Sequence, residues 1–375
     1  MIYNIICVVL RLYTGKCKGD TDITTITHIY GFYNCIFIIL LILRSFLMGI
    51  SILGMGRYVP EQVLKNDDFT RFIETDDEWI RTRTGIIERP MAGWEPTWYM
   101  GKQAALRAIE AAGIDPAMIG LVISCTATSD FHTPSMASII QHEIGAISAA
   151  AFDMNAACSG FVYATDTARR FLETDDGLKY VLVVANEALS RFIDFTDRSS
   201  CILFGDGAAA AVLEKSDKLY SSALCSDGSG ASLLCARALK IAPEVAQNKD
   251  FNDPFPEVPL HKLQQNGKEV YKFAVQALPK SFELAAEKIN VTKDDIDWFV
   301  PHQANIRIIE TAAKKLDAPM EKFIVTLDHY GNTSSASIPM ALCESIEKGI
   351  IKRGQKLALI GFGAGLTYGG IILEY

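Results

Sequence analysis

Three short polar segments carry the side chains that could do chemistry in this sequence. Cys158 lies in DMNAACSGF, His302 in PHQAN, and Asn332 in HYGNTSSAS. A helix is predicted over residues 159–172, and the positive end of a helix lowers the pKa of a thiol, whose thiolate is the nucleophile. A neutral histidine and a fixed amide could together donate hydrogen bonds to a developing oxyanion. The combination predicts covalent catalysis by a cysteine.

Each of these residues also has a purely structural interpretation. Free cysteine is among the most buried residue types, so Cys158 could simply fill the core. His302 follows a predicted strand, where α/β proteins build ligand sites, but it could be a surface or capping residue. Asn332 could belong to a turn that caps the next helix. The residues alone leave both interpretations open.

Two further segments could bind a ligand. The glycines of Gly361-Phe-Gly-Ala-Gly365 do not follow GxGxxG or a phosphate-loop pattern, and backbone N–H groups there could complete an oxyanion hole. In residues 76–85, Trp79 stands near two arginines, Arg81 and Arg83, and a guanidinium group can stack on an aromatic face or grip phosphate. The alternative for that segment is an amphipathic helix with a capping box between Thr75 and Glu78.

Composition limits the class of protein. The chain has 375 residues, 49% of them hydrophobic and 21% charged, which is ordinary for a globular enzyme. Its formal net charge of −8 argues against a protein that coats nucleic acid. Nine cysteines without a CxxC pair or Cys/His ligand spacing indicate reduced thiols and no zinc site.

Residues 1–47 differ from the rest of the chain. Their apolar run over residues 35–43 is about half the length that a spanning helix needs, and no signal-peptide order is present. Three interpretations are open: a misassigned start with Met48 as the initiator, an anchor or targeting segment, or a structured extension.

Internal similarity predicts a duplicated α/β unit. Residues 114–123 resemble residues 291–300, and FGDG at 204–207 has its counterpart in FGAG at 362–365. We expect one half over 48–220 and a second over 221–375. Residues 229–265, rich in proline, are expected to form a mobile loop or cap. The main helices are expected over 100–112, 159–172, 273–289 and 306–316, and buried strands over 121–125, 180–185 and 297–300.

From about Met48 to Tyr375 the chain resembles β-ketoacyl-acyl carrier protein synthase III, a condensing enzyme of the thiolase superfamily. The resemblance rests on seven motifs in family order: GMGRYVPEQVL, TDDEWIRTRTGI, FDMNAACSGF, TDRSSCILFGDGAAAAVL, VPHQANIRII, GNTSSASIP and GFGAGLTYG. It implies a five-layered α-β-α-β-α thiolase-like fold built from two duplicated halves. It also implies decarboxylative condensation of a short acyl-CoA primer with malonyl-acyl carrier protein, with no metal or redox cofactor.

The resemblance assigns roles to residues. Cys158 accepts the acyl group, His302 and Asn332 complete the catalytic set, and the backbone N–H groups of Cys158 and Ala364 form the oxyanion hole. The remaining assignments are Trp79, Arg83, Arg198, Gly267 and Asn305 for coenzyme A, Thr133, Leu189 and Phe204 for the primer pocket, and Lys272, Arg307, Lys314 and Lys315 for acyl carrier protein.

The resemblance further implies a cytoplasmic homodimer, although residues 1–47 leave an anchor open. Lys268 replaces an asparagine that is familiar in one coenzyme A contact. Thr133 replaces a bulky phenylalanine of acetyl-selective members, at a position that lines the partner subunit's pocket, and so suggests room for a longer or branched primer.

Several alternatives stay open. The chain could be a related synthase of secondary metabolism, or a non-catalytic carrier-protein-binding module. A degradative thiolase is disfavoured because residues 361–370 hold no second cysteine, and a synthase with two histidines is disfavoured by Asn332.

Overall fold

The computed structural model describes residues 49–239, 255 and 260–375. The expectations for residues 1–47 therefore lie outside the described residues. Among the described residues, no helix is both long and apolar enough to cross a membrane.

The first sheet has five strands in the order β1-β7-β6-β4-β5. The strand β4 is parallel to β5 and β6, whereas β7 is antiparallel to both β1 and β6. Continuous apolar sequence over β6 fits its position, since this strand is buried along its whole length. The bounds are β1 (Gly49–Tyr58), β4 (Ile119–Cys125), β5 (Ala150–Met154), β6 (Tyr180–Glu187) and β7 (Gly207–Ser216).

The second sheet has the order β11-β12-β13-β8. The strands β11 and β12 run parallel, and the other two pairs are antiparallel. The bounds are β8 (Tyr220–Ser226), β11 (Trp298–Pro301), β12 (Lys356–Gly363) and β13 (Thr367–Glu374).

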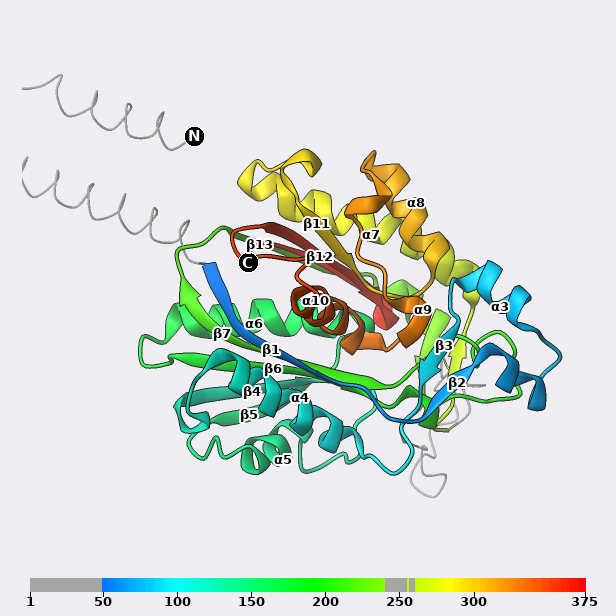
Figure 1. Ribbon diagram of the computed structural model, residues 1–375, viewed down its shortest axis with the longest axis horizontal. Coiled ribbons are helices and arrows are strands. Elements are labelled where there is room, and N and C mark those ends of the chain that lie inside the picture. The colour runs from blue at the N-terminus through cyan, green and yellow to red at the C-terminus, as the bar shows by residue number, and fades with distance from the viewer. Residues whose placement is uncertain (1–48, 240–254, 256–259) are drawn as a thin grey trace, which may run out of the picture. The chain divides into compact units, whose positions relative to one another are not determined.

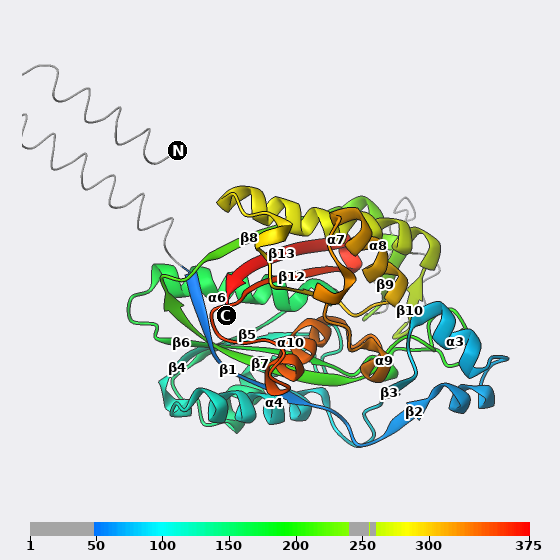
Figure 2. The ribbon, with the colours of Figure 1, turned by 45° about the horizontal axis from the view of Figure 1, so that its top comes forward.

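Helices form three layers around the two sheets. The helices α6 (Gly160–Thr174) and α10 (Ser337–Glu347) lie between the sheets and contact both (Figures 1 and 2). The outer face of the first sheet is covered by α4 (Thr97–Ala112) and α5 (Met136–Glu143), and the second by α7 (Gly267–Ile289) with α8 (Ile306–Leu316) packed beside it. The expected five-layered α/β fold is confirmed.

Short elements connect the layers near the ends of the sheets. Residues 229–265 were expected to form a loop or cap, but their described part is more regular: a 3₁₀ turn over Gly228–Leu233 precedes β9, which pairs with β10. The remaining bounds are β2 (Val63–Lys65), α3 (Asp77–Thr84), β3 (Glu88–Pro90), β9 (Leu234–Ala236), β10 (Leu263–Gln265) and α9 (Leu327–Tyr330).

A buried carboxylate ties the central helix α6 to the second sheet. Asp166 is 0% exposed and accepts hydrogen bonds from Ser222 at 2.6 Å and Tyr220 at 3.2 Å, both in β8. It also pairs with Arg169 and Arg170 of its own helix. Burial alone would raise the pKa of Asp166, but the hydrogen bonds from Ser222 and Arg170 hold this pKa below its ordinary value. The ionised carboxylate therefore stabilises the folded state at neutral pH.

Replacing this carboxylate should weaken the fold. We expect Asp166→Asn to lower the free energy of unfolding by about 3 kcal/mol at pH 7, since the partly buried Arg169 and the hydroxyl groups of Tyr220 and Ser222 lose their charged partner. Urea denaturation followed by fluorescence measures the change. The matched control is the exposed Asp217, for which Asp217→Asn should stay within about 0.5 kcal/mol. Equal effects of the two substitutions would contradict the assignment.

Candidate active site

Cys158 lies at the entrance to the central helix. It belongs to a 3₁₀ turn, Ala157–Ser159, that joins β5 to α6, and it is 8% exposed. The end of β12 passes very close: a Cβ on Gly363 would lie 2.6 Å from the backbone nitrogen of Cys158. Glycine is therefore required at this position, and the glycine-rich segment from the second half reaches the nucleophile of the first.

The acidity of the thiol differs from the sequence-based expectation. Burial raises the pKa of Cys158 to about 12, and a hydrogen bond with the Ser334 side chain only partly offsets that effect. The nearby carboxylate of Glu187 raises this pKa further. The expectation of a lowered pKa was wrong for the ligand-free structure, because it counted the helix terminus and omitted desolvation. The resting side chain is a thiol.

His302 follows β11 and is 1% exposed. Its Nδ1 lies 2.7 Å from Ser337 Oγ, so Nε2 is the ring nitrogen that can face a ligand. Burial lowers the pKa of His302 to about 3. The imidazole is consequently neutral throughout the physiological range, which suits a hydrogen-bond donor and excludes a resident positive charge.

Asn332 begins the polar loop that leads into α10. It is 6% exposed, and its backbone bonds to Leu203 and Gly205 at 2.9 and 3.0 Å. Its Oδ1 accepts the backbone N–H of Ser334 at 2.9 Å. Since the oxygen is engaged there, the Nδ2 amide group is the part of the side chain that can donate to a ligand.

Two cavities meet at Cys158. A cavity of about 240 Å³ is lined by all three residues of the predicted catalytic set, Cys158, His302 and Asn332. A larger cavity of about 620 Å³ extends from the same cysteine and has mainly apolar walls. The predicted residues Leu189, Phe204 and Ala364 line the larger cavity. The structure thus brings together residues that are 174 positions apart in the sequence, Cys158 and Asn332.

The residues predicted for coenzyme A line the smaller cavity: Trp79, Arg83, Arg198, Gly267 and Asn305. The guanidinium carbon of Arg198 lies 3.9 Å from the centroid of a Trp79 ring, and that of Arg83 lies 4.9 Å away. Asn305 also caps α8, because its Oδ1 accepts the backbone N–H of Arg307 at 2.9 Å. The capping interpretation is confirmed, and the same residue also lines the smaller cavity.

Other predicted residues lie away from both cavities. Thr133 is exposed and lines neither cavity within its own described chain. The four predicted carrier-protein residues are exposed on α7 and α8, and two of them make local contacts: Lys272 pairs with Glu269 at 2.7 Å, and Arg307 donates to Thr82 O at 2.9 Å. The exposed set is Lys272, Arg307, Lys314 and Lys315.

Supporting residues of the site were missed in the sequence. Thr367 Oγ1 contacts Ala156 O at 3.0 Å and Ser159 Oγ at 3.2 Å, on either side of Cys158. Ser337 orients His302. The sequence held a signal for one of the missed residues, since the acidic Glu187 follows closely after the apolar run YVLVVA. Among the described residues, no cluster of three or more His, Cys, Asp or Glu side chains could hold a metal ion.

Comparisons with known proteins agree with this geometry. Residues 152–236 match the family described as 3-oxoacyl-[acyl-carrier-protein (ACP)] synthase III, and residues 286–375 match its C-terminal family. The chain is 44% identical over 329 residues to beta-ketoacyl-[acyl-carrier-protein] synthase III of Clostridium acetobutylicum, covering 87% of this chain and 99% of the relative.

Solved structures give the same result. The 3-oxoacyl-[acyl-carrier-protein] synthase III of Aquifex aeolicus is 39% identical, with a TM-score of 0.79 over 87% of this chain and 100% of that chain. The priming beta-ketosynthase of the R1128 polyketide pathway is 38% identical, with a TM-score of 0.74 over 87% and 96%.

The fold and the cavity at Cys158 define the class: a thiolase-like condensing enzyme, which is an acyltransferase. Within that class, the chain belongs to the β-ketoacyl-acyl carrier protein synthase III family. The family, the fold and the enzyme class expected from the sequence are confirmed.

The neutrality of His302 can be tested directly. We expect its Cε1–H resonance to stay constant between pH 5 and 8, because burial lowers the pKa of this histidine to about 3. His329 is the internal comparison: burial opposes protonation there, but hydrogen bonds with Asp328 and Glu344 raise the pKa above its ordinary value. The His329 resonance should therefore shift within the range. NMR of labelled protein checks both, and titration of His302 near pH 6.5 would contradict the assignment.

Proposed function

We propose that this protein initiates type II fatty acid synthesis. It condenses a short acyl-CoA primer with malonyl-acyl carrier protein, with loss of CO₂, through an acyl group held on Cys158. One observation carries the proposal: Cys158, His302 and Asn332 line a single cavity that is also bordered by Trp79 and two arginines.

The first half-reaction loads the cysteine. Cys158 Sγ attacks the thioester carbonyl of the primer. The tetrahedral oxyanion accepts hydrogen bonds from the backbone N–H groups of Cys158 and Ala364. The new C–S bond forms to Cys158 as the bond to the coenzyme A sulfur breaks. The proton that leaves the Cys158 thiol ends on the departing coenzyme A sulfur, so acylation is balanced without another reactant.

The second half-reaction forms the carbon–carbon bond. Malonyl-acyl carrier protein loses CO₂, and the resulting enolate oxygen accepts hydrogen bonds from His302 Nε2 and Asn332 Nδ2. A neutral His302 fits this role, since it donates without transferring its proton. The enolate carbon attacks the acyl group, the bond to Cys158 breaks with its electron pair left on Sγ, and 3-ketoacyl-acyl carrier protein leaves. A proton taken up from solvent then restores the Cys158 thiol. As written, the steps call for no metal or redox cofactor.

Coenzyme A is proposed to enter through the smaller cavity. Trp79 and Arg198 would hold the adenine by stacking, and Arg83 would contact phosphate. Gly267, at the start of α7, and Asn305 line the same cavity and would contact the pantetheine arm.

The proposed surface for acyl carrier protein lies beside this entrance. Its exposed cations, Lys272, Arg307, Lys314 and Lys315, come from α7 and α8, and α8 begins with Asn305 as its cap. A local basic surface on a chain of net charge −8 would steer an acidic partner toward the cavity.

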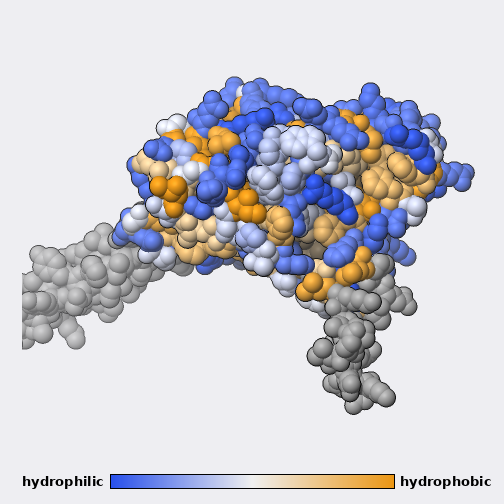
Figure 3. Space-filling model, turned by 90° about the horizontal axis from the view of Figure 1, so that it is seen from below, coloured by the Kyte–Doolittle hydropathy of each residue, from blue (hydrophilic) through white to orange (hydrophobic). Residues whose placement is uncertain are grey.

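We also propose a cytoplasmic homodimer, in which the halves 48–220 and 221–375 of each subunit build one site. The strand β5 is an outer strand of the first sheet, and such an edge can pair with another chain. Phe131 is 49% exposed and Ile147 is 77% exposed near that edge in sequence. Seen from the side of α4 and α5, hydrophobic patches lie among hydrophilic ones (Figure 3). Thr133 would then line the partner subunit's pocket.

A related synthase of secondary metabolism is the second candidate. The 38% identity to the priming ketosynthase of a polyketide pathway favours it almost as much as the 39% identity to the Aquifex enzyme favours the first. The chemistry at Cys158 would be the same, and the product distinguishes the two candidates. A non-catalytic binding module is disfavoured because the full catalytic set lines one cavity.

The nucleophile can be tested by substitution. We expect Cys158→Ala to abolish condensation of acetyl-CoA with malonyl-acyl carrier protein, by more than about 1,000-fold, because no acyl group can be held. Decarboxylation of malonyl-acyl carrier protein should persist. Mass spectrometry of the carrier protein measures both products. The control is Cys235→Ala, because Cys235 lines the larger cavity but has no covalent role. Condensation by Cys158→Ala would overturn the proposal.

The role of Thr133 predicts a broad choice of primer. With acetyl-, isobutyryl- and hexanoyl-CoA, we expect acylation rates of Cys158 within about tenfold of each other. Thr133→Phe should lower the rates with isobutyryl- and hexanoyl-CoA by about tenfold or more and leave acetyl-CoA within threefold, since a bulky ring narrows the pocket. Intact-protein mass spectrometry follows acylation. Strict acetyl preference in the unsubstituted protein would reject this role.

A further inference from the structure

Glu187 is a buried carboxylate for which the mechanism above has no use. It is the last residue of β6 and is 0% exposed. Among the described residues, all the hydrogen bonds recorded to its oxygens come from neutral hydroxyl and backbone N–H groups rather than from a cation. Burial raises the pKa of Glu187, and hydrogen bonds from Ser335 and Thr128 oppose that rise.

The two carboxylate oxygens bind two different segments. Oε2 accepts from Thr128 Oγ1 at 2.7 Å and from Thr126 Oγ1 at 3.2 Å, and the N–H of Ala127 lies within 3.2 Å of both oxygens. Oε1 accepts from Ser335 Oγ at 2.7 Å. Glu187 therefore joins the segment after β4 to the loop that carries Asn332, across the boundary between the two halves of the sequence.

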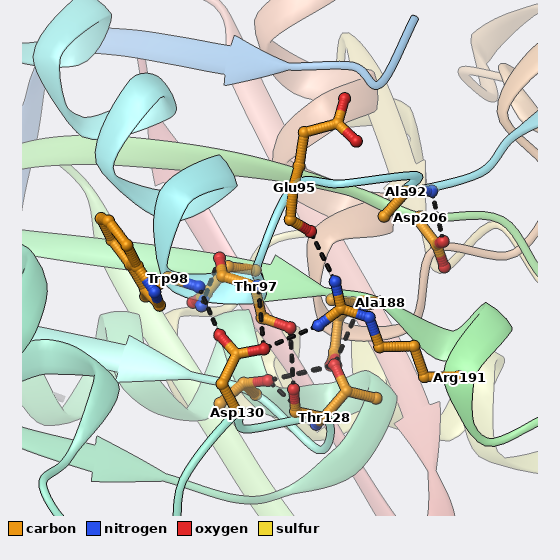
Figure 4. Close-up of polar contacts among 12 residues, drawn as sticks. Ala92, Glu95, Thr97, Trp98, Thr128, Asp130, Ala188, Arg191 and Asp206 are labelled. Atoms are coloured by element: carbon orange, nitrogen blue, oxygen red, sulfur yellow. Dashed lines mark hydrogen bonds and ion pairs between the residues drawn. The ribbon is translucent and has the colours of Figure 1, made fainter. Parts of the chain in front are cut away.

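The segment after β4 is a rigid support. Thr128 Oγ1 accepts the backbone N–H of Ala188 at 2.8 Å, and Thr128 O accepts the hydroxyl of Thr97 at 2.9 Å. Figure 4 shows Thr128 in this network, beside Asp130, which binds the first N–H groups of α4 and pairs with Arg191 at 2.7 Å. A side chain anchored to Thr128 is thus anchored to the first sheet and to α4.

The loop on the other side contains reacting groups. Ser335 is followed two positions later by Ser337, which contacts His302, and it is preceded by Ser334, whose backbone N–H binds Asn332 Oδ1 at 2.9 Å. That bond decides which end of the Asn332 amide faces the cavity. Ser334 has a positive φ of 52°, so its conformation depends on the support of its neighbours.

We propose that Glu187 is a positioning residue for the enolate-forming half-reaction. By holding Ser335 against the end of the first sheet, it fixes the Asn332 loop in the conformation that directs Nδ2 toward the substrate. Burying its charge is unfavourable. A single carboxylate can nevertheless bind both segments at once, which fixes their relative position. The inference rests on the function proposed above.

The test measures the two half-reactions separately in Glu187→Gln. The amide keeps the size of the side chain but replaces one acceptor with a donor, so at least one of the groups that donate to Glu187 must turn its hydroxyl or lose its partner. We expect acylation of Cys158 by acetyl-CoA to fall by less than about threefold or to rise, because loss of the Glu187 charge also removes one cause of the raised pKa of the thiol. We expect kcat for malonyl-acyl carrier protein decarboxylation to fall by about 30-fold, with KM changed less than twofold.

Two further variants separate positioning from general stability. Asp206→Asn alters another fully buried carboxylate, which accepts a hydrogen bond from the N–H of Ala92 (Figure 4) and binds Ser190. None of these partners belongs to the Asn332 loop. This substitution should lower the melting temperature without favouring one half-reaction. Ser335→Ala removes the loop side of the attachment and should reproduce the selective loss. Combining it with Glu187→Gln should add less than threefold to that loss.

The outcomes are distinct. Equal losses in both half-reactions of Glu187→Gln, or additive losses in the double variant, would overturn the positioning role while leaving the proposed function intact. Failure of the unsubstituted protein to acylate Cys158 or to decarboxylate malonyl-acyl carrier protein would instead overturn the proposed function. A selective loss of decarboxylation in Glu187→Gln and Ser335→Ala, absent from Asp206→Asn, would support the inference.

Discussion

Desolvation is the constraint on which the rest of the site depends. The thiol of Cys158, the imidazole of His302 and the carboxylate of Glu187 are all buried where two sheets and the central helices meet. Burial penalises the charged form of each group, so it raises the pKa values of the cysteine and the glutamate and lowers that of the histidine. The thiol and the imidazole are consequently neutral in the resting site, which acts through hydrogen-bond donors until charge develops on the substrate.

A neutral site needs accurate geometry, because dipoles act over shorter distances than charges. The structure supplies it with backbone approaches and short polar links between the halves. Gly363 lets β12 pass against the backbone of Cys158, and Thr367 bonds on both sides of the same turn. Asp166, within α6, likewise ties this helix to β8. The two halves are therefore coupled by several independent contacts around α6.

Much of this arrangement could be predicted from the sequence. The repeated segments and continuous apolar strands indicated the layered α/β fold, and the motifs around Cys158, His302 and Asn332 indicated the cavity they line. The pKa of Cys158 could not be predicted, since desolvation depends on what packs around the turn rather than on the turn itself. Glu187 was missed for a related reason: its partners, Thr128 and Ser335, are 207 positions apart and become neighbours only when the sheets are assembled.

The meeting of the two cavities at one sulfur has a consequence for the order of events. On the proposed mechanism, both thioesters must arrive through the smaller cavity, whose volume of about 240 Å³ admits one pantetheine arm at a time. The acyl group is then held in the larger cavity, and the second thioester can enter only after coenzyme A has left the smaller one. Because both thioesters use the same cavity in turn, the proposed mechanism implies double-displacement kinetics. An excess of either thioester should then compete with binding of the other.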